Sequence, residues 1–211
     1  MIKNAKSLID KSRNVAVKNN ITVNEVLQNY MFERILERLS ISKYKNNFIL
    51  KGWLLLSSIM GIDLSIDIAT GDLITPREIE YDYKMMFEDR KLTIMSYNIE
   101  SIIAEKFQTV ISRGILNSRM KDYYDLYYLV TYKKFSKDNL KKAIENTFFK
   151  RNTDLKMIDE VILEIDKSDF IRELWITYSS KYQYAKNIDF KKIIESFKII
   201  REIIEEEIEK L

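Results

Sequence analysis

The charged residues best placed to do chemistry lie in the stretch from Asn98 to Leu129. Apolar residues recur at its start in steps of three and four, a period that predicts a helix from Asn98 to Arg113. Gly114 follows as a typical helix terminator. Lys106 and Arg113 would then lie two turns apart on one stripe of this helix. One face of the helix would therefore carry two cations.

A second helix is predicted to begin near Asn117 or Ser118, because either side chain is a good N-cap. It would carry Arg119, Asp122 and Asp125 at steps of three. The two helices would thus present a lysine, two arginines and two carboxylates near one turn. On residue type alone, this pattern is typical of a solvated helix face with ion pairs three and four residues apart.

The absence of two residue types limits the chemistry that the chain can perform. Its 211 residues contain neither cysteine nor histidine. This composition excludes disulfides, thiolate metal sites and imidazole acid–base catalysis. A bound metal ion would need oxygen ligands, which makes Mg²⁺ the first candidate.

Charge is distributed unevenly along the chain. The formal net charge is +3, but residues 101–151, the basic stretch, contain eleven basic and five acidic side chains. This excess of positive charge is the footprint expected for a partner that bears phosphate. A lysine-rich helix surface also serves solubility alone, so the charge does not decide between the two interpretations.

Sparse turn residues favour long helices. Only four glycines and one proline occur, and helical periodicity is dense on both sides of a few alternating segments. Helices are expected from Ile2 to about Lys18 and, behind a capping box of Thr22 and Glu25, to about Leu39. Strands are expected near residues 64–70, 78–83 and 91–95. The predicted fold is a mainly helical α+β protein with a small residual sheet.

Two sets of side chains have open roles. Four residues of the second predicted helix are expected to form ion pairs with solvent access: Glu33, Arg34, Glu37 and Arg38. Trp175, Tyr178, Tyr182 and Tyr184 could stack on nucleic-acid bases, although this spacing is more often typical of a core.

The chain offers no candidate for a membrane anchor. Its longest apolar run, Trp53–Ile62, is ten residues long and includes two serines, which is too short to span a bilayer. The first residues lack an apolar signal core. We therefore expect a cytoplasmic protein with no membrane partner.

Three segments of the charged stretch form a specific combination, AEKF, SRG and NSRMKDYYDLY. It resembles the AEK, R and RD-x-x-D signature of the AbiEii/AbiGii-type nucleotidyltransferase toxins. The resemblance covers nearly all of the chain and includes the run RLSISKYKNNFILKG. It implies N-terminal helices and a reduced nucleotidyltransferase-like mixed sheet in residues 1–97, and a C-terminal helical bundle in residues 98–211.

The resemblance also implies a function, the toxin of a bacterial toxin–antitoxin or abortive-infection system. Such an enzyme would transfer a nucleotide from an NTP to RNA, such as a tRNA-like acceptor, with Mg²⁺, and would have a cognate antitoxin. Lys106 would neutralise triphosphate charge, and Asp122 or Asp125 would act as a base or orient this lysine. Asp67 would hold metal. The residues implied in nucleotide and phosphate binding are Lys51, Gly52, Arg113 and Arg119.

The chain departs from the family pattern at two places. Gly52-Trp53 stands where members usually have two small residues, and an indole there crowds the approach of a triphosphate to the backbone. The segment with an Asp-x-Asp or Asp-x-Glu pair is missing, an apparent internal deletion. Asp63 and Asp67 would lie roughly 13 Å apart on one strand. This spacing is too wide for ions about 3.5–4 Å apart.

Two hypotheses follow. The first is a nucleotidyltransferase toxin that is catalytically impaired in this chain. The second is a non-catalytic remnant that binds RNA, an antitoxin or an intact homologue. The absent carboxylate pair favours the second. Loss of sheet strands would also leave an unpaired edge, which favours a homo-oligomer.

Overall fold

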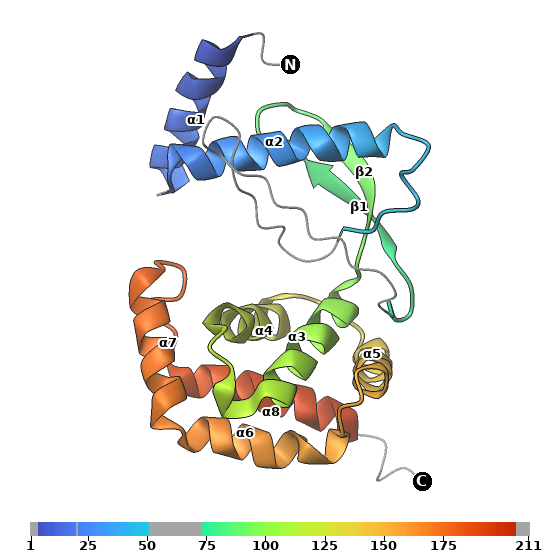
Figure 1. Cartoon of the computed structure of the whole chain (residues 1–211), viewed down its shortest axis with the longest axis vertical. Helices are drawn as coiled ribbons and strands as arrows, with labels where there is room; N and C mark the ends of the chain where they lie inside the picture. Colours follow the sequence, from blue (N-terminus) through green and yellow to red (C-terminus); the bar gives the residue numbers. More distant parts are fainter. Residues whose placement is uncertain (1–3, 20, 51–72, 206–211) are drawn as a thin grey trace. The chain divides into compact units, whose positions relative to one another are not determined.

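The computed structural model describes residues 4–19, 21–50 and 73–205 (Figure 1). Helices take up 67% of these residues, and the described strands form a small antiparallel sheet. This confirms the predicted mainly helical α+β fold. The third expected strand, at 64–70, lies outside the described residues.

The chain divides into two compact units. The N-terminal unit consists of residues 1–72 and 78–97, and the helical unit consists of residues 73–77 and 98–211. The described elements of the N-terminal unit are α1 (Ala5–Asn19), α2 (Val23–Ser40), β1 (Ile79–Lys84) and β2 (Lys91–Ser96). Those of the helical unit are α3 (Ile99–Arg113), η1 (Gly114–Leu116), α4 (Met120–Tyr132), α5 (Lys137–Lys150), η2 (Leu155–Met157), α6 (Ile158–Lys167), α7 (Asp169–Lys181) and α8 (Phe190–Glu205).

In the N-terminal unit, α2 packs against the hairpin of β1 and β2 (Figure 1). The capping box is confirmed, because the Thr22 hydroxyl accepts from the backbone of Glu25 and the Glu25 carboxylate accepts in return. The two strands pair in register from Ile79 opposite Ser96 to Lys84 opposite Lys91. A small apolar cluster joins helix and hairpin: Phe32, Leu36, Met85, Leu92 and Ile94.

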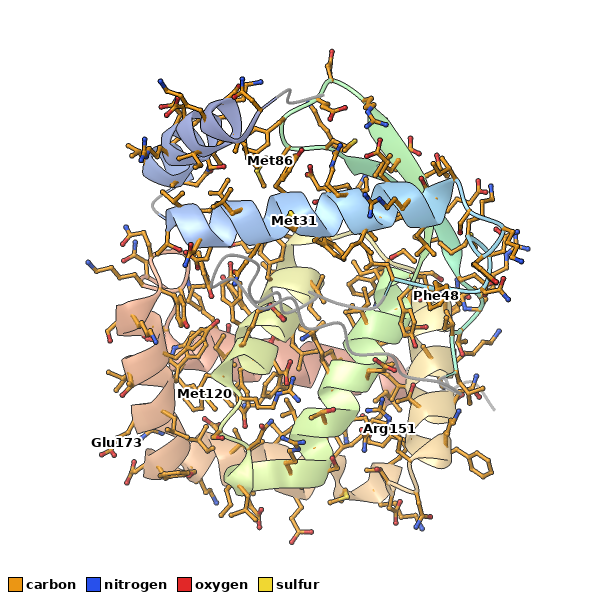
Figure 2. The ribbon with its side chains drawn as sticks, turned by 45° about the horizontal axis from the view of Figure 1, so that its top comes forward. Met31, Phe48, Met86, Met120, Arg151 and Glu173 are labelled. Atoms are coloured by element: carbon orange, nitrogen blue, oxygen red, sulfur yellow. The ribbon has the colours of Figure 1, made fainter. Side chains whose placement is uncertain are left out.

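Arg34 and Glu37 form the predicted ion pair, at 2.9 Å. The prediction of solvent access is wrong for Glu33, because the hairpin covers its face of α2. Only 1% of the residue is exposed. Its Oε1 accepts a hydrogen bond of 2.6 Å from the backbone N–H of Met86 and one of 3.3 Å from the hydroxyl of Tyr83. Figure 2 shows Met86 on the α2 side of the hairpin. Burial raises the pKa of the Glu33 carboxyl above its ordinary value.

The effect of replacing Glu33 on stability should therefore depend on whether the new side chain keeps a hydrogen-bond acceptor. Glu33→Ala is expected to cost about 2–3 kcal/mol, since it leaves the Met86 N–H buried without its acceptor. Glu33→Gln keeps an acceptor and removes the buried charge, so we expect little loss at pH 7. Hydrogen exchange of the α2 amides measures the stability change in both variants. Exposed Glu80→Ala is the matched control.

The raised pKa of Glu33 also determines how stability changes with pH. The folded state takes up the Glu33 proton before the unfolded state as pH falls, so the cost of burying the charge disappears between the folded pKa and the unfolded value near 4.5. The wild type should thus gain protection of α2 on acidification relative to Glu33→Gln. Equal pH profiles for the two proteins would contradict this account.

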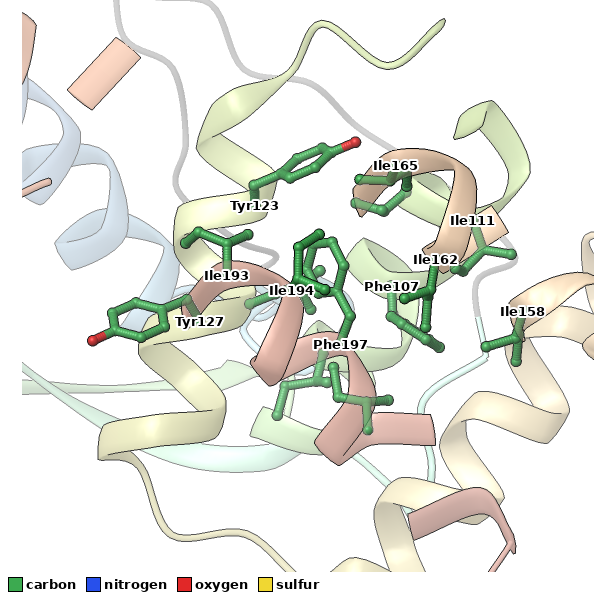
Figure 3. Close-up of a cluster of buried hydrophobic side chains, with 14 of the residues drawn as sticks. Phe107, Ile111, Tyr123, Tyr127, Ile158, Ile162, Ile165, Ile193, Ile194 and Phe197 are labelled. Carbon is green, nitrogen blue, oxygen red and sulfur yellow. The ribbon is translucent and has the colours of Figure 1, made fainter. Parts of the chain in front are cut away.

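The helical unit is built around one large apolar core (Figure 3). Phe197 of α8 packs edge-on against Tyr123 of α4, with ring centroids 5.3 Å apart, and against Phe107 of α3 at 6.4 Å. Trp175 is 2% exposed and its indole N–H donates to the carbonyl of Ile188 at 3.0 Å. Trp175 therefore belongs to the core and is not available to stack on bases.

The ends of α3 follow the sequence prediction. The Asn98 side chain accepts from the backbone N–H of Ser101 at 2.7 Å and so caps the first turn. Its amide also donates to the carbonyls of Thr75 and Arg77, which ties this short segment to the helix. Gly114 ends α3 with φ at 51°, a left-handed conformation that costs glycine little.

The predicted N-cap of α4 is wrong, although the helix begins within two residues of Ser118. The helix begins at Met120, and its N-cap position, Arg119, makes no side-chain capping bond. The Asn117 side chain instead accepts from the backbone N–H of Arg119 at 3.1 Å, two residues ahead. This local turn competes with the helical capping bond, which explains why a good N-cap residue fails to start the helix.

Candidate functional site

Lys106 of α3 lies between two carboxylates of α4. Its Nζ is 2.6 Å from Oδ1 of Asp122 and 2.7 Å from Oδ2 of Asp125. Asp122 lies in the first turn of α4, and Asp125 follows one turn later on the same face. The packing of α3 against α4 through their shared core sets this distance.

Two further cations, from α4 or the residue before it, form ion pairs with the same carboxylates. Arg119 Nε is 3.0 Å from Oδ2 of Asp122, and Lys121 Nζ is 2.9 Å from Oδ2 of Asp125. We call these five residues the ion cluster: Lys106, Arg119, Lys121, Asp122 and Asp125. With three cations and two carboxylates, the cluster has a formal charge of +1.

The ion cluster is not the solvated helix face that residue type alone would favour. Asp122 and Asp125 are 4% and 8% exposed. Helix packing buries them because α4 turns this face towards α3. An ion pair with this little exposure is screened much less than a surface pair, so its geometry is held more firmly.

The environment keeps Lys106 charged. Burial lowers the pKa of its ammonium, but the charges and hydrogen bonds of Asp125 and Asp122 outweigh burial, so the pKa is raised above its ordinary value. Lys106 is therefore an ammonium at neutral pH and cannot serve as a base there. Its role in a reaction would be to hold negative charge.

Lys106 and Arg119 still have N–H groups that could bind an anion from solvent. Lys106 has three N–H groups, and its described partners are two carboxylates. The Arg119 side chain is 59% exposed and uses only Nε in its described ion pair, so its terminal amino groups face outward. An ammonium and a guanidinium that share a carboxylate anchor are well suited to the oxygens of a phosphate.

The structure does not place every predicted residue in this cluster. Arg113, at the last residue of α3, is exposed and forms no ion pair with the acidic residues of the described ranges. Lys51, Gly52 and Asp67 lie outside the described residues. Lys121 was not among the predicted site residues, although its spacing of four before Asp125 was a sufficient signal for this ion pair.

The described residues do not fit a divalent metal ion. Across the parts of the chain that the structure describes, no three acidic side chains gather in a group that could hold one. The two carboxylates of the ion cluster already accept from Lys106, and two such ligands fall short of the oxygen set that Mg²⁺ requires. No metal ligand can be assigned within these ranges.

Family comparison covers the part of the chain that contains the ion cluster. The sequence model described as nucleotidyl transferase AbiEii toxin, type IV TA system, matches residues 57–199, and this range includes all five cluster residues. The chain belongs to the AbiEii family. No curated protein and no solved structure gives a significant match. None of the helices described for this AbiEii chain has the length and hydropathy that a membrane crossing requires.

Proposed function

We propose that this chain is the toxin of a type IV toxin–antitoxin system and that its ion cluster holds phosphate charge during transfer of a nucleotide from an NTP to RNA. The observation that carries the proposal is Lys106, an ammonium held between Asp122 and Asp125 beside an outward-facing Arg119. Family membership supplies the reaction class and implies a cognate antitoxin.

The contacts support an orienting role for the two carboxylates. Asp122 accepts from Lys106 through Oδ1 and from Arg119 through Oδ2, so both of its oxygens are engaged. Asp125 accepts from Lys106 through Oδ2 and from Lys121 through both oxygens, so neither of its oxygens is free either. A base would need a free oxygen directed at a proton, whereas these carboxylates direct two cations outward. Preorganised cations stabilise the charge that develops on phosphate oxygens in the transition state.

We also propose that transfer by this chain is slower than transfer by an intact family member. The Asp-x-Asp segment is missing from the sequence, and Gly52-Trp53 replaces a small pair. Mg²⁺ is the cofactor that the family implies, but an ion needs converging carboxylates to align the reacting groups. The lysine and arginine of the cluster supply charge and cannot supply this alignment. The natural or engineered origin of the deletion does not change the argument.

A second function, binding of RNA or antitoxin without catalysis, has its own support. Five cations of the basic stretch form no ion pair with a described acidic residue: Arg113, Lys133, Lys134, Lys142 and Lys150. Such a surface is free to contact phosphates whatever the rate of transfer. We place either activity in the cytoplasm and include self-association as a property to measure.

Incubation with labelled NTPs, Mg²⁺ and total RNA tests the proposed function. We expect slow labelling of RNA, lowered about a hundredfold by Lys106→Met because the cation at the phosphate is lost. Arg119→Ala should lower it in the same direction, and circular dichroism checks the fold of both variants. Exposed Lys192→Ala, outside the basic stretch, is the control.

Each outcome of this assay has a meaning. Labelling as fast as by an intact family member would refute the impairment. Labelling that survives Lys106→Met in a folded protein would refute the role of the ion cluster. Complete absence of labelling would leave RNA or antitoxin binding as the function.

A further inference from the structure

Six tyrosines form one continuous set of ring contacts on the surface of the helical unit. Three lie on α4 at steps of four, and three come from α7 and the segment after it. We call this set the tyrosine ladder: Tyr124, Tyr128, Tyr132, Tyr178, Tyr182 and Tyr184. The spacing of four places the α4 members on one stripe of the helix.

The rings follow each other at nearly constant spacing. From Tyr132 to Tyr128, Tyr124, Tyr184 and Tyr182, successive ring centroids are 5.5, 6.1, 4.7 and 5.4 Å apart. Two of these steps are stacked, with interplanar angles of 19° and 24°. Tyr178 joins the ladder through a hydroxyl–hydroxyl hydrogen bond of 2.9 Å to Tyr184.

Core packing accounts for only half of the ladder, because Tyr124, Tyr178 and Tyr182 are partly buried against the core and the other three rings are exposed. Tyr128, Tyr132 and Tyr184 are 37%, 63% and 51% exposed, whereas Trp175, next to the ladder, is buried. A tyrosine phenol has an ordinary pKa of about 10 and is therefore neutral at physiological pH. The ladder therefore presents uncharged aromatic surface to solvent.

A lysine lies over one ring of each half of the ladder. Lys133 Nζ lies 5.3 Å from the ring centroid of Tyr128, and Lys181 Nζ lies 5.5 Å from that of Tyr182. Neither lysine forms an ion pair with an acidic residue in the described ranges. Each lysine can therefore meet a phosphate while its stem stays over a ring.

We propose that the tyrosine ladder binds the unpaired bases of single-stranded RNA, with Lys133 and Lys181 at the flanking phosphates. Exposed aromatic rings with cations beside them are how proteins hold single strands without base-specific contacts. The run of rings is longer than one base can cover, which favours a strand over a mononucleotide. The choice of RNA rests on the proposed function.

The ladder also adjoins the ion cluster. Tyr124 precedes Asp125 directly in α4, and Tyr128 follows Asp125 by one turn. A strand stacked on the ladder would therefore bring its backbone next to Lys106. The ladder would serve to position the acceptor, and its residues would not take part in the chemical step.

Binding of a fluorescent 12-nucleotide oligouridine, without NTP or Mg²⁺, tests the proposal. Tyr132→Ala and Tyr128→Ala should each weaken binding about tenfold, because each removes one stacking ring. Tyr132→Phe and Tyr128→Phe keep the ring and should bind as the wild type does. Phe170→Ala is the control, since Phe170 is 58% exposed on α7 and makes no ring contact with another described residue.

Photo-cross-linking of 4-thiouridine RNA gives a second measurement that does not depend on affinity. We expect cross-linked peptides that contain Tyr128, Tyr132 or Tyr184, and no cross-linking of these peptides by a duplex of the same length. Unchanged affinity in both alanine variants, together with cross-links elsewhere, would overturn the proposal. A change in sedimentation of these variants without a change in RNA affinity would also overturn it and identify a protein-binding surface.

Failure of this proposal can be told apart from failure of the proposed function. Cross-linking at the ladder in a protein that transfers no nucleotide would support the ladder and refute transfer. Transfer that is unaffected by the tyrosine variants, with cross-links elsewhere, would support transfer and refute the ladder.

Discussion

Lys106→Ala is expected to destabilise the helical unit by about 3–5 kcal/mol, the usual result of removing one partner from a buried ion pair. The lost ammonium leaves Asp122 and Asp125, which are 4% and 8% exposed, without their shared cation. Two like charges would then face each other across one turn of α4. Most of the cost comes from these uncompensated carboxylates.

Urea unfolding followed by the fluorescence of Trp175, in a Trp53→Phe background, measures this loss in the helical unit. The triple variant Lys106→Met, Asp122→Asn, Asp125→Asn removes all three charges and should recover most of the stability. Lys192→Ala, an exposed lysine of α8, should stay within about 0.5 kcal/mol of the wild type. A loss below about 1 kcal/mol for Lys106→Ala would mean that the cluster is hydrated and weak.

The ion cluster also has a defined pH dependence. The pKa of Lys106 is raised above 10.5, its ordinary value, so the folded state holds this proton more tightly than the unfolded state does. The stabilisation is thus complete below the unfolded value and is lost as pH rises through the folded one. We expect Lys106→Met to remove this alkaline loss of stability.

RNA affinity should fall about 300-fold between 50 and 200 mM salt, if about six phosphates are neutralised along a single strand. The six cations available in the basic stretch are the five without a described acidic partner and the outward-facing Arg119. Release of the counterions of each phosphate drives binding, and added salt opposes that release. Fluorescence polarisation with oligouridine at four salt concentrations measures the slope.

Single substitutions show how much each cation contributes to the slope of log affinity against log salt concentration. Arg113→Ala and Arg119→Ala should each weaken binding and reduce the slope by about 0.7, the single-strand contribution of one phosphate. Lys192→Ala should leave the slope unchanged. An affinity that does not vary with salt would show that the basic stretch serves solubility alone.

Much of the fold could be predicted because its signals are local. Thr22 and Glu25 lie three residues apart, and the structure has their reciprocal capping bonds. Asn98 and Gly114 bound α3 as predicted, since capping and a left-handed terminator depend on one turn of chain. The predicted N-cap of α4 was wrong for a reason that is equally local. Asn117 could cap a helix or close a turn two residues long, and residue type does not choose between them.

Burial could not be predicted, because it depends on residues distant in the chain. Glu33 looks like a surface residue on an amphipathic helix until a hairpin 50 residues later covers it. The aromatic residues of α4, α7 and the segment after α7 have a spacing similar to that of core aromatics, yet Trp175 is buried and Tyr132 and Tyr184 are exposed. Only the packing of helices decides which side of each ring meets solvent.

For the candidate site, the residue types, their spacing and the family that they indicate could be predicted from the sequence. It placed Lys106 on one helix and Asp122 and Asp125 on the same face of the next, because helical period is a property of local chain geometry. Only the tertiary structure decided that these three groups meet at 2.6 and 2.7 Å and are buried. The free energy of an ion pair depends on its distance and on the water excluded around it, and both are set by how α3 and α4 pack.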